Sequence, residues 1–325
     1  MTNALKELPF DQYSRQVIVR ELLECLRPAS TKYKLLDIGG YKGNTSKFLH
    51  EDNVTVVDLF ESEEENYVKA SGEKLPFADE SFDYCLSFDA LEHIESSKRI
   101  RVIDEALRVA KHGVIFCAPQ ATPLNSEAEE SLNAYYKKIH GSEHRWLKEH
   151  IEYALPDFEK IVKHYQSYEP QVFYSNDIFS WSLLQGMFFL NEANNWGASS
   201  LVEINKHVNN GLGVMSGKTP ETSYRAIICI LKDKASRKKL SKFKTKVVTD
   251  EILLELLHKA QDYYSELVIN TQSHFKAETE LKNAEIELYK TRAIAAEKNL
   301  ERLKSTKAWK AYQKTKQITH LGRKN

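Results

Sequence analysis

The chain has 325 residues, and its 46 lysine and arginine residues balance 46 aspartate and glutamate residues, so the formal net charge is zero. A composition of 42% hydrophobic and 28% charged residues is typical of globular domains and excludes a disordered or collagen-like protein. The neutral charge also argues against a protein that coats nucleic acid, and the length allows two domains, or one large domain with an appendage.

The four cysteines lie far apart in apolar stretches, without the short spacings of metal ligands or redox pairs. We interpret them as buried thiols in a reducing compartment. No apolar run reaches the roughly 18 residues that a membrane span needs, and the first residues lack a signal-peptide pattern. These features predict a cytoplasmic protein. The longest apolar run, 178–190, is interpreted as a buried or interface helix.

In residues 30–120, short β-type segments alternate with helical ones, which predicts an α/β core with a parallel sheet covered on both faces. An amphipathic helix over 13–26 precedes this core, and the clearest helical connector within it is 98–110. The segment 58–67 is too short to hold a full helix with its loops. The expected strands are 34–38, 54–58, 67–70, 83–88 and 113–118.

The next zone, about 120–233, is less regular, and its residues 120–222 are interpreted as a helical insert. Its helical segments lie near 127–139 and 144–154, and an aromatic-rich patch follows at 165–174. A late strand over 224–231 ends the zone. From its position after the core, we expect the insert to build the wall of a substrate pocket, so that core and insert form one domain over residues 1–233.

The remaining residues are expected to form a basic linker (234–248), a coiled-coil helix (249–304) and a basic tail (305–325). Apolar residues from Leu253 to Leu288 recur at alternating spacings of three and four, which is the pattern of a coiled coil and predicts a homo-oligomer. The alternative is a single long helix that is solvated on all sides.

The tail combines lysine and arginine with the aromatic side chain of Trp309 and contains no acidic residue. Such a segment suits an anionic membrane surface or an acidic protein partner. The alternative interpretation is a solvated tail.

The candidate chemistry begins where the first expected strand runs into a glycine-rich turn and a helix that starts at Thr45. Glycines at 39, 40 and 43 would let a ligand approach the backbone, and the helix N-terminus would offer free N–H groups. Asp58 ends the second strand, where an acid can accept hydrogen bonds from both ribose hydroxyls of a nucleoside. A dinucleotide and S-adenosylmethionine both fit this geometry.

Four ordered segments together resemble the class I S-adenosylmethionine-dependent methyltransferases with a type 11-like domain. They are LLDIGGYKG (35–43), VVDLF (56–60), GEKLPFADESFDYCLSFDALEHI (72–94) and EALRVAKHGVIFCAP (105–119). The resemblance implies a Rossmann-like, seven-stranded methyltransferase sheet and S-adenosyl-L-methionine as the cofactor.

The resemblance also implies which residues bind the cofactor. Asp37, Gly39 and Gly43 would line its methionine end, Asp58 would hold the ribose, and Phe88 with Asp89 would close the sulfonium end. The segment from Gly72 to Leu75 would pass the adenine. The complete implied set is Asp37, Gly39, Gly40, Gly43, Asp58, Leu59, Gly72, Glu73, Leu75, Phe88 and Asp89.

Two residues depart from the family pattern. Tyr41 stands where relatives usually carry the middle glycine of Gly-x-Gly, and Ser71 stands where relatives often carry an acid that contacts the adenine. These departures support an alternative function, in which the domain is a catalytically silent scaffold that oligomerises through its coiled coil.

His93 is the candidate catalytic residue because it lies just past the fourth strand, where open parallel sheets place their ligands. An imidazole could accept the proton of a hydroxyl acceptor, and the alternative is that His93 caps a helix or supports the pocket wall. No metal site is expected, because the spacing of the following residues does not repeat one helix face: His140, Glu143, His144, Glu149 and His150.

The segment 140–162 and the end of the chain are similar to parts of methyltransferases and glycan-building enzymes of bacterial surface-polysaccharide synthesis. The predicted function is methyl transfer to a glycan or another small-molecule hydroxyl. An RNA methyltransferase is disfavoured by the neutral core and the lack of an RNA-binding motif. The tail would place the protein at the inner face of the membrane or against a glycan-synthesising enzyme.

Overall fold

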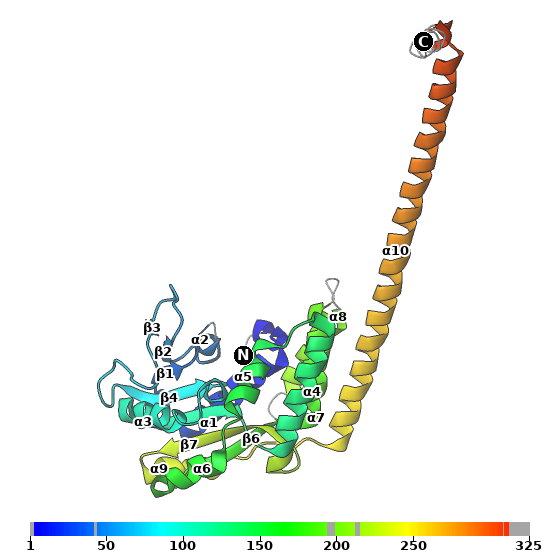
Figure 1. Ribbon diagram of the computed structural model, residues 1–325. Helices are drawn as coiled ribbons and strands as arrows, with labels where there is room; N and C mark the ends of the chain where they lie inside the picture. Colours follow the sequence, from blue (N-terminus) through cyan, green and yellow to red (C-terminus); the bar gives the residue numbers. More distant parts are fainter. Residues whose placement is uncertain (1–2, 42–43, 194–198, 212–214, 308, 312–325) are drawn as a thin grey trace. The chain divides into compact units, whose positions relative to one another are not determined.

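The computed structural model describes residues 3–41, 44–193, 199–211, 215–307 and 309–311 (Figure 1). The chain divides into two compact units, Met1–Tyr264 and Ser265–Asn325. The first unit contains the sheet and the candidate site, and the second contains the distal part of one long helix.

The first unit is built on a seven-stranded sheet with the order β3-β2-β1-β4-β5-β7-β6. The strands β1 to β5 pair in parallel, whereas β7 is antiparallel to both β5 and β6. This arrangement confirms the predicted α/β, Rossmann-like methyltransferase fold. The strands are β1 Lys34–Ile38, β2 Asn53–Asp58, β3 Tyr67–Lys69, β4 Phe82–Phe88, β5 Ala110–Pro119, β6 Gln171–Asp177 and β7 Ser223–Leu231.

The two faces of the sheet are buried by different helices, because successive strand side chains point to opposite sides. Leu36 packs in the cluster that includes Ile103 of α3, whereas its neighbour Leu35 packs in the cluster that includes Leu22 of α1. The helices of this core are α1 Phe10–Leu26, α2 Thr45–Phe48, α3 Arg99–Val109, α6 Phe158–His164 and α9 Lys234–Leu240. As the sequence predicted, no helix lies between β2 and β3.

Four helices form the layer beyond the carboxyl ends of the strands. They are α4 Pro123–His140, α5 Arg145–Tyr153, α7 Ile178–Ala193 and α8 Ser199–Gly211, and α4 and α7 lie side by side in Figure 1. The run 178–190 is helical as expected, and it buries one side, since Leu184 and Met187 are almost inaccessible whereas Phe179 is exposed. The short 3₁₀ segments are η1 Asn3–Glu7, η2 Leu91–His93, η3 Gln166–Tyr168 and η4 Pro220–Thr222.

Four helices and strands were not predicted from the sequence, and one of them is α6. The aromatic-rich patch contains the start of β6, a strand at the edge of the sheet, and α8 was not foreseen. The expected linker begins with the helix α9, because the carboxylate of Asp233 accepts a hydrogen bond from the N–H of Ser236 at 2.7 Å and Leu240 is completely buried.

The long helix α10 extends from Asp250 to Ser305, close to the predicted bounds. Its first turns belong to the first unit, where Leu256 and Tyr263 are buried and the hydroxyl of Tyr263 donates to the carbonyl of Met187 at 2.9 Å. Farther along, apolar side chains of the predicted seam such as Leu281 and Leu288 are exposed. Coiled-coil pairing stays a prediction, and residues 312–325 of the expected tail lie outside the described residues.

Among the described residues, we find no helix with the length and apolar character required to traverse a bilayer.

Candidate active site

A cavity of about 800 Å³ lies at the carboxyl ends of β1, β2 and β4. Open α/β sheets bind their ligands at this edge. The strand ends supply acidic and glycine residues to the wall, and the opposite wall comes from α1, η2, α5 and α7. Residues of the helical insert therefore line the cavity, whereas the role of this wall in substrate binding stays a prediction.

At Gly39 and Gly40, the turn after β1 has no room for a Cβ atom. Gly39 has a φ of +81°, and a Cβ atom there would lie 2.6 Å from the Cβ of Ala90. A Cβ atom on Gly40 would lie 2.3 Å from the Asp37 Oδ2 atom. The backbone can therefore pass close to the cavity only because both residues are glycine.

Asp37 lies buried beneath this turn. Its Oδ2 atom accepts a hydrogen bond from the hydroxyl of Thr45 at 2.6 Å, whereas its Oδ1 atom has no partner among the described residues. Burial raises the pKa of Asp37 to about 7. Since Asp37 also lines the cavity, its free oxygen is a candidate acceptor for a ligand N–H group.

Asp58 lies at the end of β2 and lines the same cavity. Its carboxylate accepts hydrogen bonds from the N–H groups of Tyr41 at 3.1 Å and Phe60 at 3.3 Å. The ring of Tyr41 lies 5.0 Å from the ring of Phe60 and 6.4 Å from that of Tyr67. The departure at Tyr41 thus adds an aromatic side chain beside Asp58.

The other residues in the implied cofactor set divide between the cavity and the core. Leu59, Gly72, Glu73 and Phe88 line the cavity. Leu75 packs in the hydrophobic core instead and is not among the lining residues, and Gly43 lies outside the described residues. Ser71 also lines the cavity, and its hydroxyl accepts a hydrogen bond from the N–H of Glu73 at 3.2 Å.

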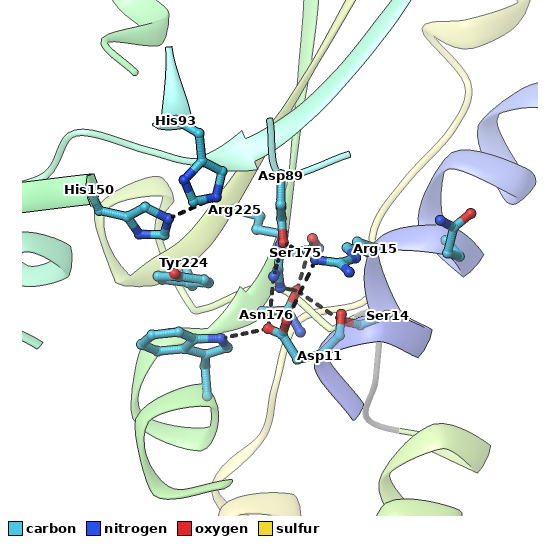
Figure 2. A network of polar contacts seen from close by, with 12 residues as sticks. Asp11, Ser14, Arg15, Asp89, His93, His150, Ser175, Asn176, Tyr224 and Arg225 are labelled. Carbon is cyan, nitrogen blue, oxygen red and sulfur yellow. Dashed lines mark hydrogen bonds and ion pairs between the residues drawn. The ribbon is translucent and has the colours of Figure 1, made fainter. Parts of the chain in front are cut away.

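Asp89 adopts the left-handed conformation, with a φ of +46°, directly after β4. Its carboxylate accepts hydrogen bonds from Arg15 of α1 and Arg225 of β7, and Asp11 pairs with the same arginines (Figure 2). Burial alone would raise the pKa of Asp89, but the two guanidinium groups hold it below its usual range. Asp89 is therefore ionised, and its ion pairs connect the end of β4 with β7 and α1. It also lines the cavity.

His93 ends η2 and is held by groups from α5. Its Nδ1 atom lies 3.0 Å from the Glu149 Oε2 atom. Its Nε2 atom lies 3.4 Å from the Nε2 atom of His150, and Figure 2 shows the two rings. The Nδ1 atom of His150 in turn lies 3.0 Å from Oε1 of Glu129, which accepts a hydrogen bond from the Tyr224 hydroxyl at 2.7 Å.

The surroundings shift the pKa values of His93 and His150 in opposite directions. Burial and the nearby His150 lower the pKa of His93 to about 4. The pKa of His150 is raised, because the carboxylate of Glu129 outweighs the opposing effect of burial. Any proton that the pair holds is therefore expected on His150.

Glu92 is completely buried next to this pair, and neither carboxylate oxygen has a hydrogen-bond partner among the described residues. Burial and the nearby charge of Asp89 raise its pKa to about 8. One ligand atom from each of Glu92, His93 and His150 lies within 4.8 Å of the other two.

The sequence analysis discussed another histidine group, the five histidine and glutamate residues between positions 140 and 150. Two of its five members, Glu149 and His150, approach His93, whereas His140 contacts the carbonyl of Phe189 and His144 caps α5. Arg225 was also missed, although an arginine inside the apolar strand β7 is a signal of a buried ionic contact.

Residues 36–118, which extend from β1 into β5, match the family model described as "Methyltransferase domain". An uncharacterized methyltransferase of Mycolicibacterium vanbaalenii is 49% identical over 47 residues, which cover 14% of this chain. Those residues span only 18% of that relative's length.

Two solved structures illustrate the structural likeness. A putative methyltransferase of Bacillus halodurans is 16% identical, with 65% of this chain and 97% of that chain covered and a TM-score of 0.35. Phosphoethanolamine N-methyltransferase 2 of Haemonchus contortus, solved in complex with S-adenosyl-L-methionine, is 19% identical. The match covers 66% of this chain and 52% of that chain, with a TM-score of 0.41.

Proposed function

We propose that this chain is an S-adenosylmethionine-dependent methyltransferase that acts on a hydroxyl group of a glycan or another small molecule. The observation that carries the proposal is that Asp37, the Gly39–Gly40 turn and Asp58 line one cavity, within the segment that matches the methyltransferase family. The same cavity, of about 800 Å³, is also lined by residues of the insert, which would contact the acceptor.

The residues present fit S-adenosylmethionine. The free Oδ1 atom of Asp37 can accept a hydrogen bond from an amino group. Because Gly39 and Gly40 carry no Cβ atom, the cofactor could approach the backbone of the turn closely. Asp58 would accept hydrogen bonds from the ribose hydroxyls, which is the role that a strand-ending acid takes in nucleoside sites. When bound, the cofactor supplies an electrophilic methyl group on its sulfonium.

In such a reaction, the protein aligns the acceptor with the methyl group and excludes water from the cavity. His93 is the proposed catalytic residue, because it lines the cavity on the side of the insert and its ring is held by Glu149. Trp146 of α5 is 43% exposed and also lines the cavity, where its indole offers a flat apolar surface to an acceptor. A glycan ring would suit this surface.

A role in surface-polysaccharide synthesis is the finer part of the proposal. It is supported by the similarity of residues 140–162, which contain α5, to methyltransferases of that group. The protein would act as a cytoplasmic homo-oligomer joined through α10, and its basic tail would contact the inner face of the membrane or a glycan-synthesising enzyme. Sedimentation with vesicles of anionic lipid, compared for the full chain and a chain ending at 304, tests the membrane contact.

The test of the central proposal is a calorimetric titration of the full-length protein with S-adenosylmethionine, followed by a mass-spectrometric screen of sugar-nucleotide and glycan acceptors. We expect saturable binding and an acceptor that gains the mass of one methyl group. Absence of cofactor binding would favour the catalytically silent scaffold instead.

A further inference from the structure

The two imidazole rings beside Glu92 face each other in an arrangement that needs a positive charge between them. Because carboxylates accept hydrogen bonds, Nδ1 of His93 must donate to Glu149, and Nδ1 of His150 must donate to Glu129. In the neutral rings, both Nε2 atoms then carry lone pairs, and these atoms lie 3.4 Å apart. Either a proton or a metal ion must lie between them.

We propose that Glu92, His93 and His150 form a binding site for one divalent transition-metal ion. At a metal–nitrogen distance of about 2.05 Å and a tetrahedral angle, two imidazole nitrogens lie about 3.3 Å apart. The observed separation of 3.4 Å matches this spacing. Two imidazoles and one carboxylate are a donor set that Zn²⁺, Co²⁺ and Fe²⁺ accept.

Glu92 is the observation that distinguishes this site from a simple histidine pair. Its carboxylate is completely buried, and both oxygens lack a partner among the described residues. A buried carboxyl group without hydrogen bonds destabilises the fold, and a bound cation would compensate it. Since the three ligand atoms lie within 4.8 Å of one another, the Glu92 carboxylate needs to approach by roughly 1.5 Å to complete the coordination.

The surroundings of the histidines have the form of an outer coordination shell. Each histidine has a carboxylate on the nitrogen that would face away from the metal, and Glu129 is itself fixed by the hydroxyl of Tyr224. Such partners orient metal-binding rings and increase the basicity of the ligating nitrogen. Glu129 and Glu149 are therefore positioning residues.

The proposed ion would keep an open position toward the cavity, since Glu92, His93 and His150 all line it. Three protein ligands with one open position are typical of catalytic rather than structural sites. An oxygen of the acceptor would bind there, and with the ion bound His93 would serve the reaction as its ligand instead of accepting the proton itself. This role of the ion rests on the proposed methyl transfer, whereas binding of the ion does not.

The test uses the full-length protein after dialysis against a chelator, titrated with Zn²⁺ and with Co²⁺ alone. We expect one tightly bound ion per chain and visible Co²⁺ absorption typical of nitrogen and oxygen ligands in a low-symmetry site. His93→Ala should weaken Co²⁺ binding at least 100-fold, because it removes a ligand. Glu129→Gln should weaken it roughly 10- to 100-fold, because it changes the group that orients His150. His50→Ala, which removes an exposed imidazole outside the cavity, is the matched control and should bind as the unchanged protein does.

Absence of saturable binding to the unchanged, folded protein would overturn the proposal and leave a proton as the occupant of the histidine pair. Equal Co²⁺ affinity in the unchanged protein and the His93→Ala variant would also overturn it, because the ion would then lie elsewhere. Circular dichroism of each variant confirms folding. S-adenosylmethionine binding, measured in parallel, tests the proposed function separately.

Discussion

The Nε atom of Arg225 on β7 lies 2.8 Å from the Oδ1 atom of Asp89 at the end of β4, although 136 positions separate the two residues. Arg225 is 1% exposed. Its guanidinium also contacts Asp11 of α1, so this one side chain ties α1 and two strands together beside the cavity.

Arg225→Met keeps much of the side-chain volume and removes this buried charge. We expect the free energy of unfolding to fall by about 3 to 5 kcal/mol, because Asp11 and Asp89 would then share Arg15 alone. Urea denaturation measures the change. Arg101→Met, at an exposed arginine of α3, should change the stability by no more than about 0.5 kcal/mol. An equal effect of the two substitutions would contradict the assigned role of Arg225.

Asp58→Ala should weaken S-adenosylmethionine binding by about 1 to 3 kcal/mol, the magnitude expected when a hydrogen bond to a charged group is lost. Calorimetric titration gives the affinity. Glu63→Ala is a suitable control, because Glu63 is an exposed acid that does not line the cavity. If Asp58→Ala binds the cofactor as tightly as the control does, the cofactor site has been assigned wrongly.

His93→Ala should lower turnover with a hydroxyl acceptor roughly 100-fold or more and leave S-adenosylmethionine affinity nearly unchanged. The reason is that His93 lies on the insert side of the cavity, next to α5, rather than at the glycine turn. Initial rates and cofactor titrations of the same preparation separate the two quantities. Unchanged turnover would reduce His93 to a structural residue.

Asp37 predicts a pH dependence of stability in the cofactor-free protein. Its pKa rises from 3.8 to about 7 on folding, so between about pH 4 and pH 7 the folded state keeps a proton that the unfolded state has released. This residue therefore lowers stability progressively as the pH rises through that window. At one pKa unit per about 1.4 kcal/mol, the full effect is at most about 4 kcal/mol.

Asp37→Asn removes this titration and can keep the contact with Thr45 through its amide oxygen. The variant should gain roughly 1 to 4 kcal/mol relative to the unchanged protein between pH 4 and pH 8. Urea denaturation of both proteins at several pH values checks the slope. A stability difference that does not vary with pH would show that Asp37 is ionised throughout this range.

The distal part of α10 is predicted to mediate self-association. Deleting residues 265–325 should give a monomer that still binds S-adenosylmethionine, because the cavity lies wholly within the first unit. The sequence pattern placed the boundary at 249, but a cut there also removes Leu256 and Tyr263, which are buried, and should lower stability. Light scattering compares the proteins, and a monomeric full-length chain would contradict the coiled coil.

The sequence by itself determined the local and sequential features of this protein. The glycine turn, the strand-ending Asp58 and the apolar strands could be recognised because each depends on residues within a few positions of one another. The bounds of every strand except β6, and those of α10, were predicted to within a few residues for the same reason. The seven-stranded sheet came from the family resemblance that these local features support.

Only the tertiary structure decided which distant polar groups meet. Arg225 and Asp89, and likewise His93 and His150, are brought together by packing of the insert and β7 against the strand ends, which no periodicity encodes. Neither the free carboxylate of Glu92 nor the elevated pKa of Asp37 could be foreseen, since both follow from burial. Burial depends on the sum of contacts made by residues far apart in the chain.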